Sequence, residues 1–352
     1  MTLSRLGLAA STAALFLAPT MALAAPQVVV SIKPVHSLVA AIMKGVGEPA
    51  LVVEGAASPH TYSLKPSNAR ALENANLVFW VGHGLEAFLD KPLEALAGKA
   101  TVVELEDVPG LVRLPFREGG AFEAHDHGHE GEAGHDEHAA HDDHADEQHA
   151  ADGHAAEEHA GEEHAGEAHD HDHEHEHEHG GIDMHLWLDP MNAKAMAAAI
   201  ESALVTADPE NAERYKANGA ALAAEIDALD KEIAATVQPV ADKPFIVFHD
   251  AYQYFEHRYK VRVAGSITVS PETMPGAERV AEIHGKVKEL GAACVFAEPQ
   301  FEPKLVSVVT EGTDAKAGTL DPEGGALEAG PGLYPELMRN LANSLKECLS
   351  RS

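Results

Sequence analysis

The chain has 352 residues and a formal net charge of −32, and 24 of its residues are histidine. Of its 57 acidic residues, 21 lie between positions 123 and 179, where there is no lysine or arginine, which leaves −11 for the rest of the chain. An acidic surface repels phosphates, so this balance argues against nucleic acid or an anionic membrane as a partner and is compatible with attracting cations.

The first 24 residues have the pattern of a cleaved signal peptide. Arg5 gives a positive start, residues 6–17 are apolar, and Ala22-Leu23-Ala24 is an A-x-A cleavage signature. The apolar part is shorter than the roughly 20 residues that a membrane span needs. We therefore expect export to the periplasm and a mature chain that begins near Ala25.

In the first half of the mature chain, short runs rich in Val and Ile alternate with helical patterns, which is typical of βαβ units and a parallel sheet. The expected strands are 27–32, 51–53, 77–81 and 101–105. The expected helices are 34–44, 66–74 and 85–96. A tract rich in histidine and acids follows at 118–181, and regular structure resumes at 184–188 before a helix at 192–205.

A longer helical pattern comes next. Asp208 supplies an N-cap and Pro209 a first-turn proline. The apolar positions that recur at helical spacing are Leu222, Ile226, Leu229 and Ile233. The pattern within 208–237 predicts some 28 helical residues, roughly 42 Å at 1.5 Å per residue, which is more than one small lobe needs. We interpret it as a connection between two lobes, with a plain surface helix as the alternative.

The second half repeats the alternation of the first. The expected strands are 245–248, 261–264, 293–296 and 316–320. The expected helices are 251–259, 277–290, 304–310 and 334–349. We therefore predict an α/β fold in which two Rossmann-like lobes with parallel sheets, 25–207 and 238–352, are joined by the helix 208–237. Such folds usually bind their ligand in the cleft between lobes.

The chain has two cysteines, Cys294 and Cys348. In an oxidising compartment such a pair usually forms a disulfide, here closing a loop of about 55 residues. A metal–thiolate site is the alternative, although neither cysteine has a second thiol or a histidine close in sequence.

Seven histidines lie outside the acidic tract. Three of them, His60, His185 and His249, are at or near the ends of apolar runs beside turn residues, where a side chain can face a cleft. Three neutral imidazoles suit Zn²⁺ in tetrahedral geometry, with bonds of about 2.0–2.1 Å. The other four are interpreted as structural, the last two of them solvent-facing: His36, His83, His257 and His284.

The tract itself holds 17 of the 24 histidines. Several recur every five residues, which turns a helix by about 140° per step, so they do not share one face. We predict a disordered accessory chelator of Zn²⁺, with a solvated loop that has no metal as the alternative. The histidines taken as its ligands are His125, His127, His129, His171, His173, His175, His177 and His179. An HExxH pattern at 173–177 follows from composition alone and does not indicate a hydrolase.

Five segments carry a family resemblance. Three of them resemble signature segments of the metal-binding proteins of ABC importers: Ser58-Pro59-His60-Thr61-Tyr62-Ser63-Leu64-Lys65-Pro66-Ser67, Met184-His185-Leu186-Trp187-Leu188-Asp189-Pro190 and Phe248-His249-Asp250-Ala251-Tyr252. Phe296-Ala297-Glu298-Pro299-Gln300-Phe301 and Gly318-Thr319-Leu320-Asp321-Pro322 resemble later motifs in the same order. The resemblance covers nearly all of the mature chain, and its nearest type is the periplasmic zinc-binding ZnuA type.

The resemblance implies that His60, His185 and His249 bind one Zn²⁺ between two lobes, and that Asp321 lies close enough to add an oxygen. It also implies delivery of the ion to the membrane permease of a zinc ABC importer, by a protein that is not an enzyme and that we expect to be monomeric. The chain departs from the family pattern at two positions. Pro59 stands before the first histidine, where some zinc-binding members have an acidic residue, and Glu323 follows Asp321-Pro322, where leucine is common. The fourth ligand therefore stays open between water and Asp321.

Three other functions are the alternatives to zinc delivery. A manganese or iron carrier of the same family is disfavoured by a third histidine where such relatives commonly have a carboxylate. A periplasmic zinc buffer or chaperone would have no membrane partner. A zinc hydrolase would need an open metal position beside a general base, and the sequence indicates no such base.

Overall fold

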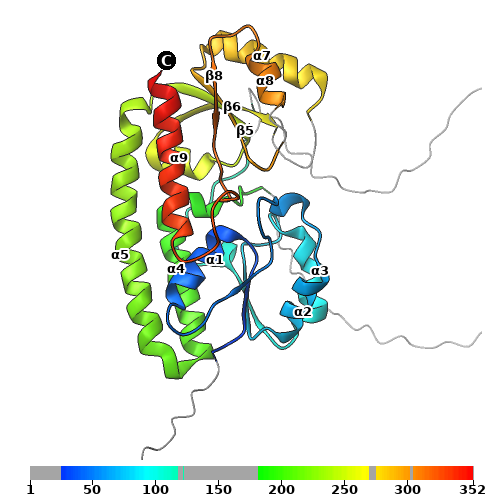
Figure 1. Cartoon of the computed structure of the whole chain (residues 1–352), viewed down its shortest axis with the longest axis vertical. Helices are drawn as coiled ribbons and strands as arrows, with labels where there is room; N and C mark the ends of the chain where they lie inside the picture. Colours follow the sequence, from blue (N-terminus) through cyan, green and yellow to red (C-terminus); the bar gives the residue numbers. More distant parts are fainter. Residues whose placement is uncertain (1–24, 118–121, 123–180, 269–274, 302–303, 352) are drawn as a thin grey trace, which may run out of the picture. The chain divides into compact units, whose positions relative to one another are not determined.

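The structure is a computed structural model that describes residues 25–117, 122, 181–268, 275–301 and 304–351. These residues belong to one compact unit built around two four-stranded sheets (Figure 1). The predicted signal peptide lies outside the described residues, and so does the histidine-rich tract apart from Phe122 and Gly181, including all eight of its proposed ligands. Among the described residues, no helix is long and apolar enough to span a membrane.

The N-terminal sheet has the strand order β2-β1-β3-β4, and every pair is parallel. Its strands are β1 (Val28–Val30), β2 (Ala50–Leu51), β3 (Leu77–Trp80) and β4 (Thr101–Glu104). Its helices are α1 (Lys33–Ile42), α2 (Pro66–Asn74), α3 (Asp90–Leu96) and α4 (Pro190–Ala207). The helix expected over 85–96 begins later, because Ala87–Leu89 forms a separate 3₁₀ turn before α3.

The C-terminal sheet repeats this topology, with the order β6-β5-β7-β8 and parallel pairing throughout. Its strands are β5 (Pro244–His249), β6 (Arg262–Thr268), β7 (Cys294–Ala297) and β8 (Lys316–Thr319). Its helices are α6 (Gln253–Tyr259), α7 (Ala277–Leu290), α8 (Lys304–Thr310) and α9 (Leu333–Ser350). The prediction of two halves alike in plan is confirmed.

Strand residues in the C-terminal sheet alternate between two buried faces. Ile246 and Phe248 belong to a core with residues of α7 and α8. Phe245 and Val247 belong to the main core, which also takes in the helices of the first half. Successive side chains of a strand point to opposite faces of the sheet. When both faces are covered, every side chain of the strand is buried, and its sequence is therefore a continuous apolar run.

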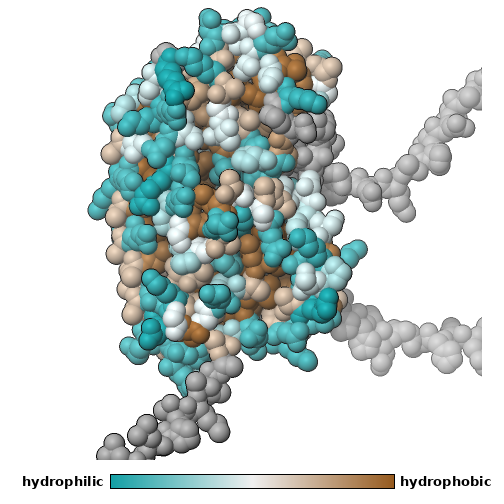
Figure 2. Space-filling model, viewed as in Figure 1, coloured by the Kyte–Doolittle hydropathy of each residue, from teal (hydrophilic) through white to brown (hydrophobic). Residues whose placement is uncertain are grey.

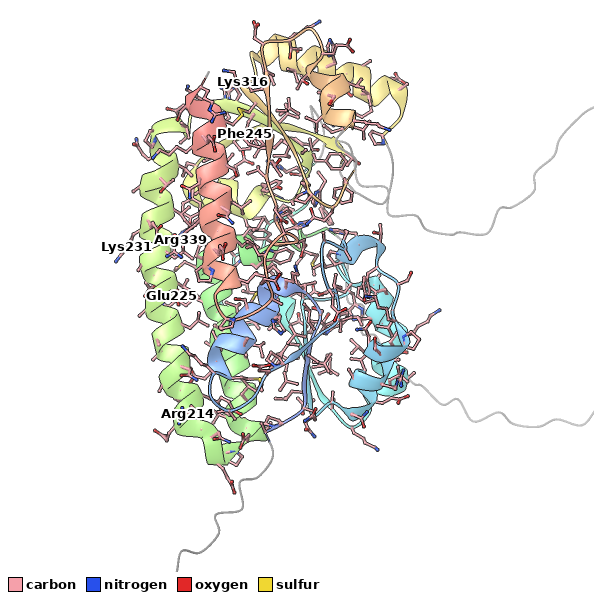
Figure 3. The ribbon with its side chains drawn as sticks, viewed as in Figure 1. Arg214, Glu225, Lys231, Phe245, Lys316 and Arg339 are labelled. Carbon is pink, nitrogen blue, oxygen red and sulfur yellow. A yellow bond between two sulfur atoms is a disulfide. The ribbon has the colours of Figure 1, made fainter. Side chains whose placement is uncertain are left out.

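Two long helices contact both halves of the chain. The helix α5 (Ala212–Val237) packs on α1 and α4 and also on α6 and α9, and α9 contacts α1 as well as β8. Arg339 of α9 points toward α5 (Figure 3), where Glu232 accepts from its Nε at 3.0 Å. The sequence predicted the α5 connection but not the second one.

The start of α5 differs from the prediction. Asp208 and Pro209 begin a 3₁₀ turn, Pro209–Asn211, and α5 follows from Ala212. The carboxylate of Asp208 accepts from the hydroxyl of Tyr215 at 2.8 Å, so it is bound to a side chain and does not cap the helix backbone.

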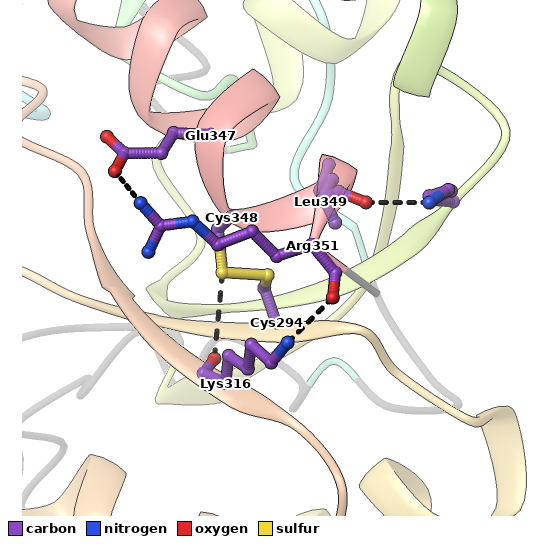
Figure 4. The surroundings of a disulfide bond; sticks show 7 residues. Cys294, Lys316, Glu347, Cys348, Leu349 and Arg351 are labelled. Carbon is purple, nitrogen blue, oxygen red and sulfur yellow. Dashed lines mark hydrogen bonds and ion pairs between the residues drawn. A yellow bond between two sulfur atoms is a disulfide. The ribbon is translucent and has the colours of Figure 1, made fainter.

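The predicted disulfide is present between Cys294 and Cys348, with their Cα atoms 6.3 Å apart. It ties the start of β7 to the last turn of α9 (Figure 4). Beside it, Lys316 donates to the carbonyl of Arg351 at 2.7 Å, and Lys243 donates to the carbonyl of Leu349 at the same distance. Two ammonium groups therefore satisfy carbonyls that a helix C-terminus leaves unpaired.

The face shown in Figure 2 is covered mainly by hydrophilic residues, with smaller hydrophobic areas between them. Over the described residues the strongly exposed large hydrophobic side chains are Val102 and Val308. Isolated apolar side chains of this kind are ordinary on a protein surface.

Candidate metal centre

His60 lies in a short 3₁₀ turn, Pro59–Thr61, that follows β2. Pro59 occupies the first position of the turn, where its missing N–H costs nothing. The hydroxyl of Tyr62 donates to the carbonyl of Val52 at 2.9 Å and fixes the chain just after the histidine. His60 is half-buried and is the most exposed of the three predicted ligands.

His185 stands at the N-terminus of the 3₁₀ turn Leu186–Leu188, directly before α4. Its backbone N–H donates to Asp183 at 3.0 Å. Asp189 then caps α4 by accepting from the N–H of Met191 at 2.8 Å. The buried indole of Trp187 donates to the carbonyl of Pro322 at 2.9 Å, which joins this segment to the second half of the chain.

His249 is the last residue of β5, at the carboxyl end of a parallel sheet. Glu298 comes directly after β7, the strand that neighbours β5. Since parallel strands end at the same edge, the two side chains meet there. Both are buried, His249 at 3% exposure and Glu298 at 3%.

The three imidazoles converge through their Nε2 atoms. His60 Nε2 lies 3.4 Å from His185 Nε2, and His249 Nε2 lies 3.2 Å from His185 Nε2. Within the described residues these three form the one group of three or more His, Cys, Asp or Glu residues that could hold a metal ion, with ligand atoms that all lie within 4.8 Å of one another. Two nitrogens bound tetrahedrally to zinc at about 2.05 Å are about 3.3 Å apart. The two pairs that include His185 therefore have the spacing that a single tetrahedral ion requires.

Two buried carboxylates orient these rings. Asp183 accepts from Nδ1 of His185 at 2.7 Å, and Glu298 accepts from Nδ1 of His249 at 2.8 Å. A proton held on Nδ1 leaves the Nε2 lone pair free to bind a metal. The sequence interpretation missed both acids, although Asp183 lies two residues before a predicted ligand and Glu298 lies inside a quoted motif.

The surroundings shift the pKa values of the rings in different directions. Burial, and then the neighbouring imidazoles of His185 and His249, hold the pKa of His60 well below its ordinary value. Burial also disfavours protonation of His249, but the carboxylate of Glu298, together with those of Asp250 and Asp183, outweighs it and raises the pKa of His249. His60 is thus kept neutral, while His249 is the ring on which a proton competes with a metal.

Aromatic side chains enclose the buried side of the cluster. The ring of Trp187 lies 5.4 Å from that of His185, and the ring of Phe301 lies 6.0 Å from that of His249. Phe301 also stacks on Phe248 at 4.9 Å. Apolar walls keep water away from the imidazoles on this side and strengthen electrostatic interactions with a bound ion.

Asp321, the predicted oxygen donor, does not belong to the cluster. Its Oδ1 accepts from Gln300 at 2.9 Å and from the N–H of Gly325 at 3.1 Å, and its Oδ2 accepts from the N–H of Ala326 at 3.2 Å. These bonds hold the turn after β8. The geometry gives no support to Asp321 as the fourth ligand, and that assignment stays a prediction.

The remaining histidines of the described chain have other partners. His36 contacts the carbonyl of Pro49 at 3.0 Å, and His83 pairs with Asp90 at 2.7 Å. His257 is exposed as predicted. His284 was expected to face solvent, but it is half-buried and its Nδ1 contacts the carbonyl of Val309 at 3.0 Å, because α8 packs against α7.

The chain has two parallel β-sheets, linked by long helices, and three imidazoles that meet at one point. These features define a metal-binding solute-binding protein. The family model of zinc-uptake complex component A, periplasmic (ZnuA), matches residues 28–150 and 142–348. Over 324 residues the chain is 58% identical to the high-affinity zinc uptake system protein ZnuA of Brucella suis biovar 1, with 92% of each chain covered. The chain belongs to the ZnuA family.

Solved structures agree on the fold. A crystal structure of ZnuA aligns with a TM-score of 0.65 at 23% identity, covering 91% of this chain and 99% of that one. The solute-binding protein FpvC of Pseudomonas aeruginosa, in complex with Mn²⁺, aligns with a TM-score of 0.68 at 16% identity, covering 93% and 99%. At these identities the likeness establishes the architecture, and the metal must be argued from the residues of this chain.

Proposed function

We propose that this protein captures Zn²⁺ with His60, His185 and His249 and delivers it to the membrane permease of an ABC importer. The observation that supports this function most strongly is the convergence of three Nε2 atoms, with neighbouring pairs 3.2 Å and 3.4 Å apart. The ion is cargo that must be released again. The family is one of transport proteins, and we assign no enzymatic role to the chain.

The donor set supports zinc as the cargo. Three imidazole nitrogens suit Zn²⁺, whereas Mn²⁺ prefers carboxylate, carbonyl and water oxygens. The carboxylates behind His185 and His249 fix the tautomers of both rings, as in many zinc sites. A carrier of Mn²⁺ remains the competing proposal, because the structural neighbour FpvC is in complex with Mn²⁺.

We propose water for the fourth coordination position. Asp321 is engaged by three donors, so it would have to break those bonds to reach the ion. The half-burial of His60, beside two buried ligands, supports an open position on the side of this residue. An exchangeable ligand there also suits a protein that must give up its cargo.

The periplasm is the proposed compartment. A buried disulfide persists in an oxidising environment and is rare in the cytosol. The matched family is described as periplasmic, and the first 24 residues have a signal-peptide pattern. We expect the protein to meet its permease as a monomer and to have no nucleic-acid partner.

The test is a zinc titration of the full chain in competition with a chromophoric chelator. We expect His60→Ala, His185→Ala and His249→Ala each to remove the tightest site. His284→Ala, which removes a half-buried imidazole that contacts a carbonyl, is the matched control and should leave that site unchanged. Competition with Mn²⁺ in the same assay should show preference for Zn²⁺. Retention of the tight site in all three variants would refute the assignment.

Delivery is tested separately in cells. Deleting the gene should abolish high-affinity zinc uptake at low external zinc, and a chain with His185→Ala should fail to restore it. Normal uptake in the deletion strain would favour a buffer or chaperone without a membrane partner.

A further inference from the structure

The histidine-rich tract leaves and rejoins the described chain through two short antiparallel segments. We call them the neck: residues 112–117 and 181–183. The N–H of Phe116 donates to the carbonyl of Gly181 at 2.8 Å, and the N–H of Asp183 donates to the carbonyl of Leu114 at 2.9 Å. Pro115 and Ile182 form the bridge between them. The neck thus has its own backbone pairing, independent of both sheets.

Side chains at the start of α6 hold the neck against the second half of the chain. The N–H of Leu114 donates to the hydroxyl of Tyr254 at 3.1 Å. Gln253 donates to the carbonyl of Pro115 at 3.0 Å. Tyr254 is fully buried, so its hydroxyl is a fixed acceptor for the neck.

Arg117, at the end of the first neck segment, forms ion pairs with two carboxylates, those of Asp250 and Glu256. Its Nε donates to Asp250 at 3.1 Å, a second guanidinium nitrogen bonds the other oxygen of Asp250, and a third bonds Glu256. The side chain of Asp250 is 3% exposed, and that of Arg117 is 20% exposed. Phe122 covers the guanidinium, with its ring centre 4.0 Å away. A planar fork that binds both oxygens of a buried carboxylate fixes its position and orientation.

Both segments of the neck reach the metal ligands. Asp183, in the returning segment, orients the ring of His185 through the 2.7 Å bond to Nδ1. Asp250, held by the outgoing segment, is the residue directly after His249. One small structure therefore contains the carboxylate that orients His185 and also bonds the residue that follows His249. These two imidazoles come from opposite halves of the chain.

We propose that the neck is a positioning element of the metal centre and that Arg117 is its principal positioning residue. This inference rests on the proposed function, because it concerns the affinity of the same zinc site. Arg117 acts through Asp250, by setting where β5 ends and how His249 is presented to the ion. Metal ligands must be held to within about 0.5 Å of their productive positions, and losing such support typically costs 10–100-fold in metal affinity.

The experiment compares Arg117 with Arg258, a second forked arginine nearby. Arg258, on α6, donates to both oxygens of Asp230 at 2.9 Å and 2.6 Å, and neither residue touches a histidine of the cluster in the described contacts. Arg117→Lys keeps the charge and loses the fork. The double variant Arg117→Gln with Asp250→Asn removes the ion pair without leaving the buried carboxylate of Asp250 unpaired, and Glu256, the other partner of Arg117, is 25% exposed and can be hydrated. Arg258→Lys, and Arg258→Gln with Asp230→Asn, are the matched controls.

Three quantities are measured on each full-length variant: zinc affinity by chelator competition, the visible spectrum of the Co²⁺-loaded protein, and the apo melting temperature. We expect both Arg117 variants to lose at least tenfold in affinity and to change the Co²⁺ spectrum. The Arg258 variants should lower the melting temperature while leaving affinity within about twofold and the spectrum unchanged.

The possible failures are distinguishable. Wild-type affinity and an unchanged Co²⁺ spectrum in the Arg117 double variant would overturn the positioning role and leave the zinc-binding function intact. Equal affinity losses in the Arg117 and Arg258 variants would also overturn it, because the effect would then be one of general stability. If the alanine variants of the three histidines keep the tight zinc site, the proposed function fails first.

Discussion

Replacing Glu298 by glutamine tests how the buried carboxylate tunes the zinc site. Glu298 accepts from Nδ1 of His249 at 2.8 Å, and both residues are 3% exposed, so solvent does not screen the interaction. A glutamine amide at this position can present either its oxygen or its N–H to Nδ1, and the tautomer that frees Nε2 is then no longer enforced. We expect Glu298→Gln to weaken zinc binding about 10–100-fold at pH 7.5, or about 1.4–2.7 kcal/mol.

The pH dependence of the same variant provides a second readout. Glu298 raises the pKa of His249 against the effect of burial. In the wild type, a proton therefore competes for this ring from a higher pH than it does once the carboxylate is neutralised. We predict that the difference in affinity between wild type and Glu298→Gln narrows as the pH falls from 7.5 to 5.5.

Chelator competition at several pH values measures both effects. Glu86→Gln is the matched control, because Glu86 is also fully buried but its described hydrogen bonds go to Ser31 and the backbone of Val81 and Gly82, and not to an imidazole. It should leave the zinc affinity unchanged. Wild-type zinc affinity of the Glu298→Gln protein at pH 7.5 would refute the reasoning. So would a difference in zinc affinity between wild type and variant that grows as the pH falls.

Three further predictions follow from the structure. Zinc affinity of the wild type should fall between pH 7.5 and 5, since the raised pKa of His249 makes a proton compete with the ion; isothermal titration across that range checks it, and a flat profile contradicts it. Replacing Cys294 and Cys348 by serine removes a disulfide with a sequence separation of 54. A denaturant titration should show the apo protein destabilised by about 4 kcal/mol. Zinc affinity should stay the same, and a change above threefold would mean that the metal site depends on the disulfide. Deleting residues 123–180, which keeps the neck, should lower the number of weakly bound zinc ions and leave the tight site unchanged, as equilibrium dialysis can show; loss of the tight site would contradict this.

Much of the fold could be predicted because its signals are local. Buried parallel strands read as continuous apolar runs, and the repeated alternation with helices indicated two equivalent sheets before any contact was known. The bounds of α7 and α8 agree with the expected ranges. The predicted start of α5 was wrong. Asp208 was expected to cap this helix, but its carboxylate accepts from the hydroxyl of Tyr215, a contact that the residue pattern does not reveal.

The site was predictable only in part, for a physical reason. His60, His185 and His249 stood out at the ends of apolar runs and in motifs of a known type, and the fold brings them together. Their supports were not apparent, because Glu298 meets His249 only through the pairing of β5 with β7. Arg117 meets Asp250 across 133 residues of sequence, and no local pattern indicates that pairing.

The central claim is that three imidazoles from distant parts of the chain hold one ion. A crystal structure of the zinc-loaded protein, with the metal located by its anomalous signal, tests it most directly. We predict a single strong peak about 2.0–2.1 Å from Nε2 of His60, His185 and His249. A zinc ion held by other residues, with these three nitrogens free of metal, would contradict the account.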